Sequence, residues 1–83
     1  MHLPTIHDNG TSKQQLQAEY ENASGALEEA YQVLKRTAPN LRNYYIQDPT
    51  FFAMALLEHM QRLQRLDSIK EEIDAITTAL DHA

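Results

Sequence analysis

The chain has 83 residues, which is enough for one small domain but little for a self-sufficient core. It contains no cysteine, so disulfide bonds and thiolate metal sites are excluded, and self-association is the remaining source of stability. The net charge of −5 argues against general nucleic-acid binding, because phosphate contacts require a basic surface. No apolar run approaches the roughly 18 residues of a membrane span, and no signal peptide is evident. We therefore expect a cytoplasmic protein without membrane contact.

Residues 1–12 are predicted to form an arm that precedes the first helix. The segment holds one of the three prolines and one of the two glycines, and it has few apolar side chains. Ser12 followed by Gln15 fits a capping box, and so does Thr11 followed by Gln14. We favour Ser12 as the N-cap of the first helix. Residues 13–83 then form a single helical domain.

The first helix is predicted from residue 13 to about residue 37, because apolar side chains recur at alternating steps of four and three. This spacing is typical of a coiled-coil seam, and alanines within it would let another helix approach closely. Gly25 costs the helix about 1 kcal/mol relative to alanine, so either a neighbour packs on it or the helix is locally weak. Pro39 ends the helix. The seam residues are Leu16, Tyr20, Ala23, Leu27, Ala30 and Leu34.

The second helix is predicted over residues 49–81, with Asp48 as N-cap and Pro49 at the first helical position. At about 1.5 Å per residue it is about 50 Å long, so loops cannot cover its apolar stripe and it needs helical partners. Between Leu66 and Ile73 the stripe passes either through Ile69 or through Lys70, and we favour Ile69 because it is apolar. The remaining stripe residues are Phe52, Leu56, His59, Leu63, Ile76 and Leu80.

These elements predict an all-α fold, an antiparallel two-helix hairpin that assembles into an oligomeric helical bundle. The two helices differ by roughly two turns, so the overhang must be covered by the arm, by the connection or by another copy of the chain. Residues 35–65 carry a net charge of +3 and residues 67–83 a net charge of −4. This asymmetry favours head-to-tail or antiparallel association.

The connection between the helices holds the best candidate for a ligand site. Arginine offers a planar fork for phosphate, tyrosines offer flat faces for a ring, and amides can read polar edges. The alternative is that the tyrosines only plug the open end of the hairpin. A site for an anionic, nucleotide-like ligand would comprise Arg42, Asn43, Tyr44, Tyr45 and Gln47, then His59 and Arg62, and Asn9 and Thr11 from the arm of another subunit.

Catalysis and metal binding are not expected. The serines have no histidine at a local spacing that would activate them, and neither glycine belongs to a phosphate loop. No Glu-x-x-His pair exists to build a di-metal site in a bundle, so we expect no metal and no cofactor. On an apolar stripe, His59 is more commonly a buried, hydrogen-bonded histidine than a ligand-binding group.

The chain carries three motifs: N-G-T-S at residues 9–12, A-P-N-L-R-N-Y-Y at residues 38–45, and E-H-M-Q-R-L at residues 58–63. They resemble a family of small helical proteins from bacteria and their phages or prophages. The resemblance implies a protein that acts by binding, as an inhibitor or decoy of host defence or by sequestering a nucleotide signal. We therefore expect a non-enzymatic binding protein that captures an anionic nucleotide-like ligand or a host protein. The alternative is a structural, self-associating helical adaptor.

Overall fold

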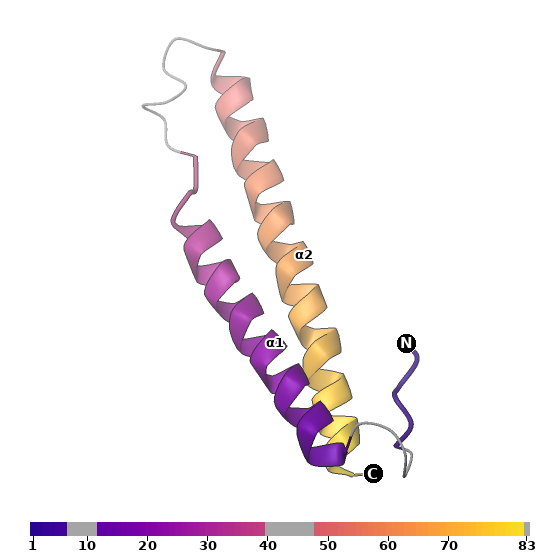
Figure 1. The fold of residues 1–83 in the computed structure, drawn as a ribbon. Coiled ribbons are helices and arrows are strands. Elements are labelled where there is room, and N and C mark those ends of the chain that lie inside the picture. Colours follow the sequence, from indigo (N-terminus) through magenta and orange to yellow (C-terminus); the bar gives the residue numbers. More distant parts are fainter. Residues whose placement is uncertain (7–11, 40–47, 83) are drawn as a thin grey trace.

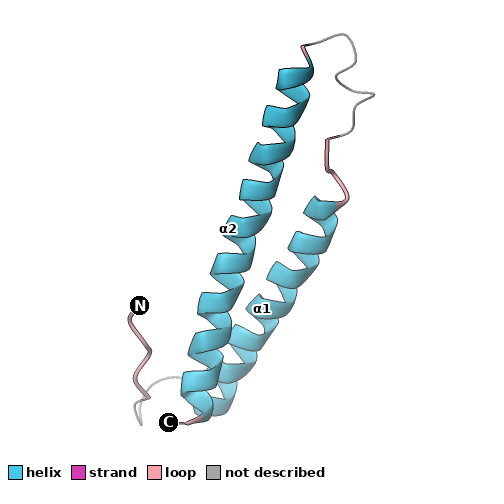
Figure 2. Cartoon of the chain, turned by 180° about the vertical axis from the view of Figure 1, so that it is seen from behind, coloured by secondary structure: helices cyan, strands magenta, loops and turns pink. Residues whose placement is uncertain are grey.

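The computed structural model describes residues 1–6, 12–39 and 48–82. Within them the chain forms two helices, α1 (Lys13–Lys35) and α2 (Pro49–Asp81), and no strand. The helices run antiparallel and pack against each other along the length of α1 (Figure 1). The all-α hairpin predicted from the sequence is therefore confirmed. Seen from behind, α2 is clearly the longer element, and the chain's ends lie near the end of the hairpin where α1 begins (Figure 2).

Both helices begin at the residues that their capping signals predict. The hydroxyl oxygen of Ser12 accepts a hydrogen bond of 3.1 Å from the backbone N–H of Gln15. The Asp48 carboxylate accepts one of 2.8 Å from the N–H of Thr50, and this bond lowers the pKa of Asp48 below its ordinary value. Each cap satisfies a backbone donor that has no partner inside the helix.

The first helix ends at Lys35, two residues before the predicted boundary. The N–H groups of Arg36, Thr37 and Ala38 each donate to the carbonyl three residues back, at 3.1, 3.0 and 3.4 Å. The Thr37 hydroxyl also donates to the Leu34 carbonyl at 2.7 Å. These tighter turns satisfy the last carbonyls just before Pro39, so the regular helix stops early.

Two side-chain contacts between the helices fix their register. The Ser24 hydroxyl donates to the Asp74 carboxylate at 2.5 Å, and the Gln17 amide donates to the Asp81 carboxylate. From Gln17 to Ser24 the chain advances seven residues along α1, and the partner on α2 moves back seven residues, from Asp81 to Asp74. Continuing this register for eleven residues brings the end of α1 level with Leu63. Residues 49–62, the part of α2 called the overhang below, therefore extend beyond α1 by about 21 Å.

The core is thin and lies mainly where the two helices overlap. Leu80 is 2% exposed and Ile76 is also buried, and both belong to the predicted stripe. Of the other predicted seam residues, His59 is buried, Ala30 and Ile69 are exposed, and the rest are half-buried. Ala30 lies at the edge of the α1 face that turns toward α2. Half-buried are Leu16, Tyr20, Ala23, Leu27 and Leu34 of α1, and Phe52, Leu56, Leu63, Leu66 and Ile73 of α2.

The prediction that Ile69 fills the irregular step of the stripe is wrong. Ile69 is 45% exposed, whereas Lys70 is half-buried at the seam position. The Lys70 ammonium lies 2.9 Å from the Asp74 carboxylate one turn later. A lysine can occupy an apolar seam in this way because its aliphatic stem packs while its charged end reaches a polar partner. The four-three rhythm of α2 therefore continues to Ile73, and the two successive steps of three fall at Lys70, Ile73 and Ile76.

Candidate functional site

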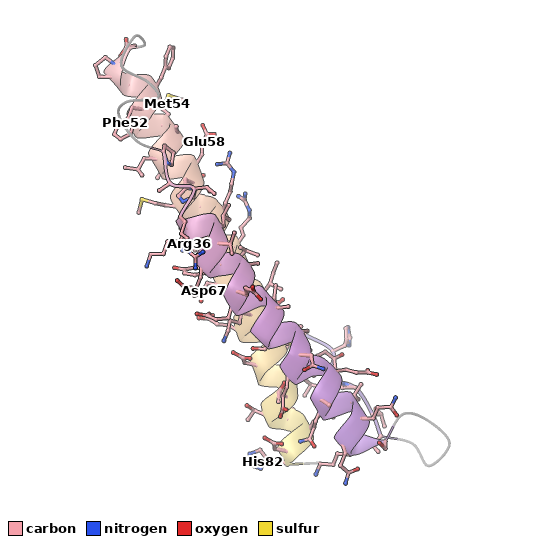
Figure 3. All side chains as sticks on the ribbon, turned by 60° about the vertical axis from the view of Figure 1, so that its left-hand side comes forward. Arg36, Phe52, Met54, Glu58, Asp67 and His82 are labelled. Carbon is pink, nitrogen blue, oxygen red and sulfur yellow. The ribbon has the colours of Figure 1, made fainter. Side chains whose placement is uncertain are left out.

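The overhang of α2 carries an unusual density of exposed apolar side chains. Phe51, Met54, Leu57 and Met60 are between 52% and 57% exposed, and all four lie beyond the end of α1. At about 100° per residue, their directions spread over roughly half of the helix circumference. A helix that is apolar on most sides is normally enclosed by neighbours. In Figure 3 the labelled Met54 lies well beyond Arg36, which marks the end of α1.

The opposite side of the overhang is covered within the chain. Phe52, Ala55 and Leu56 are half-buried, and His59 is 4% exposed. The helical period of the sequence predicted this side. The exposed side was not predicted, although the run FFAMALLEHM at residues 51–60 contains only Glu58 and His59 as titratable groups. The signal was the shortage of polar residues, which a single apolar stripe does not explain.

His59 is buried as predicted, but its hydrogen bonding is incomplete. The ring atom Nε2 has no hydrogen-bond partner in the part of the chain that the structure describes. Depending on the tautomer, this atom donates or accepts a hydrogen bond. Leaving a buried polar atom unpaired costs about 1–3 kcal/mol. His59 is therefore a group to which an additional partner would bring a specific gain.

Arg62 lies one turn after His59 and is on the surface. Its guanidinium is 3.6 Å from the Glu58 carboxylate, and the two side chains are both about half exposed. An exposed pair at this spacing contributes only about 0.3–0.5 kcal/mol. The pair therefore leaves Arg62 able to exchange Glu58 for another anionic group. The other predicted ligand residues, Arg42, Asn43, Tyr44, Tyr45, Gln47, Asn9 and Thr11, lie outside the described residues.

Two open grooves adjoin the overhang. The first, of about 570 Å³, is lined by Gln61, Gln64, Arg65, Ser68 and Ile69, all on the outer side of α2. The second, of about 400 Å³, lies between the helices near the end of α1, where Tyr31 and Asp67 flank Met60, Leu63 and Gln64. The first groove thus continues the exposed side of the overhang along the same helix.

Asp74, Lys70 and Ser24 form the main polar cluster between the helices. The hydrogen bond from the Ser24 hydroxyl lowers the pKa of Asp74, and the bond from Lys70 lowers it further. The same bond to Asp74 raises the pKa of Lys70. Every member of this cluster has a partner, so we interpret the cluster as structural. The described residues contain no group of three or more histidine or acidic side chains placed to hold a metal ion.

Comparison of the chain with protein-family models, with curated proteins and with solved structures finds no match. Among the residues that the structure describes, neither helix is both long enough and apolar enough to cross a membrane.

Proposed function

We propose that this protein is a self-associating helical adaptor, which acts through the exposed side of the α2 overhang. The observation that supports this best is the set of four large apolar side chains that remain half exposed beyond α1. Scattered single apolar residues on a surface need no explanation, but a contiguous group marks an interaction site. This was the alternative in the sequence analysis, and the overhang now makes it the favoured function.

Association would also answer the size problem of the chain. Within the described residues only Ile76 and Leu80 are buried apolar residues. A core of this size gives little stability alone, and oligomerisation is a common remedy in small chains. We therefore propose that the oligomeric bundle is the working form. We also propose that it acts in the cytoplasm, and by binding rather than by catalysis.

Co-purification of differently tagged copies tests this function. Two versions of the full chain, one with an affinity tag, are expressed together, and the untagged version should be retained on the affinity matrix. Replacing both Phe51 and Leu57 with glutamine should abolish retention, because both are on the overhang and exposed. Val33→Gln is the matched control, since Val33 is a similarly exposed apolar residue on α1. Retention that survives the double replacement and fails with Val33→Gln would move the interface to α1.

A second candidate function is capture of an anionic nucleotide-like ligand, by a phage-derived protein that counteracts host defence or sequesters a nucleotide signal. The observation that favours it is the buried, unpaired Nε2 of His59, three residues from Arg62. ATP is a suitable probe, because it combines a base with phosphates. Under this function, millimolar ATP should shift the NMR resonances of the His59 ring in the full chain. Unchanged His59 resonances at saturating ATP would remove the support that this histidine gives.

A further inference from the structure

We infer that α2 pairs antiparallel with α2 of a second copy through a second seam on its outer side. This inference rests on the proposed self-association and specifies its geometry. Beside the stripe that faces α1, α2 carries another set of residues at alternating steps of three and four. All are exposed in the single hairpin. They are Phe51, Met54, Glu58, Gln61, Arg65 and Ser68.

The outer seam has two unlike halves. One half, on the overhang, presents the exposed side chains of Phe51 and Met54. The other half is the groove lined by Gln61, Gln64, Arg65, Ser68 and Ile69. Ile69 follows Phe51 by eighteen residues, which is five helical turns, so both point in the same direction. A two-fold interface uses the same patch on both copies and must be self-complementary, and a projecting half beside a groove meets that requirement.

Antiparallel pairing brings each projecting half onto the groove of the other copy. In such coiled coils the two kinds of seam position face each other across the axis. Phe51 then lies opposite Ser68, Met54 opposite Arg65, and Glu58 opposite Gln61 of the second copy. The aliphatic stem of Arg65 would cover the Met54 thioether, while its guanidinium stays in water. The apolar overhang is thereby covered by residues that are themselves exposed in the hairpin.

The charges distinguish this arrangement from the parallel one. In the antiparallel register, Leu57 lies opposite Arg62 of the second copy, so Glu58, the next residue, lies close enough to pair with that Arg62. The two-fold symmetry repeats this pair. In a parallel register, Glu58 would face Glu58 and Arg65 would face Arg65, which is unfavourable. The ion pair between Glu58 and Arg62 inside one chain is long, at 3.6 Å, and half exposed. The Glu58 and Arg62 side chains of the two copies can therefore form one network of four charged groups across the two-fold axis.

Cysteine cross-linking tests the register, and the chain is suited to it because it contains no cysteine. The full-length variants Met54→Cys and Arg65→Cys are mixed in a glutathione redox buffer, and the disulfide-linked pairs are separated by mass. Both positions are exposed, so each variant should keep the helical circular dichroism of the parent. We expect the mixed 54–65 pair to exceed its share under random pairing. Mixing Met54→Cys with Val33→Cys is the control and should give only the random share.

The other outcomes are distinguishable. Dominance of both the 54–54 and the 65–65 pairs would indicate a parallel dimer, and dominance of the 54–54 pair alone would indicate another antiparallel register. Either result would overturn the inference, while leaving self-association intact. A random mixture of linked pairs from a chain that sediments as an oligomer would also overturn the register alone. Random cross-linking from a chain that sediments as a monomer would overturn both the register and the proposed function.

Discussion

Replacing Met54 with glutamine should weaken association without affecting the single hairpin. The two residues have similar length and similar helix propensity, and Met54 is 52% exposed, so the fold of one chain loses little. Full burial of such a side chain is worth about 1.5–3 kcal/mol. About half of that, roughly 0.8–1.5 kcal/mol, remains to be gained per copy on association. A two-fold dimer contains Met54 twice, so the substitution should cost about 1.5–3 kcal/mol, which raises the dissociation constant about 10- to 150-fold.

Sedimentation equilibrium over a concentration series measures this change directly. Met60→Gln is the matched control, because Met60 is 57% exposed on the same overhang but points away from the outer seam. Its dissociation constant should stay close to that of the parent. Equal weakening by the two substitutions would refute the assignment of the seam and indicate undirected apolar association. An unchanged constant for Met54→Gln would refute the role of the overhang in association.

Three further predictions concern the hairpin itself. Leu80→Ala should lower the free energy of unfolding by about 2–5 kcal/mol in urea titrations, since Leu80 is the most buried apolar residue described. Gly25→Ala should raise it by about 1 kcal/mol, because an added Cβ meets nothing within 4 Å. Because the Ser24 hydroxyl lowers the pKa of Asp74, this carboxylate stabilises the fold above its unfolded pKa and loses that effect as the pH falls. Ser24→Ala should therefore move the Asp74 titration, followed by carboxyl ¹³C NMR, to higher pH, and should lower the free energy of unfolding more at neutral pH than in acid.

The features that sequence reasoning predicted are those fixed by short-range physics. The caps at Ser12 and Asp48 follow from one side chain and a donor two or three residues away. The stripe that packs on α1 follows from the helical period, and its residues Ile76 and Leu80 are indeed buried. Such features need no knowledge of the neighbouring helix.

The features that it missed are those that the apolar stripe does not report. Lys70, rather than the apolar Ile69, is the seam residue, because the helical period turns it toward α1 and its ammonium reaches the Asp74 carboxylate one turn later on α2. Phe51 and Met54 lie beside the stripe that faces α1, and the period of that stripe does not indicate that their own side of α2 is apolar and exposed. For the candidate ligand site, only His59 and Arg62 lie among the described residues, so the role of the connection stays a prediction.

Sedimentation velocity of the unmodified full chain, over a concentration range from micromolar to millimolar, tests whether the hairpin associates. We expect a discrete oligomer with an even number of chains, which dissociates on dilution. Thermal stability should also rise with protein concentration, because the oligomer is the more stable state. A mass of one chain at every concentration, with a concentration-independent melting temperature, would show that the hairpin does not associate.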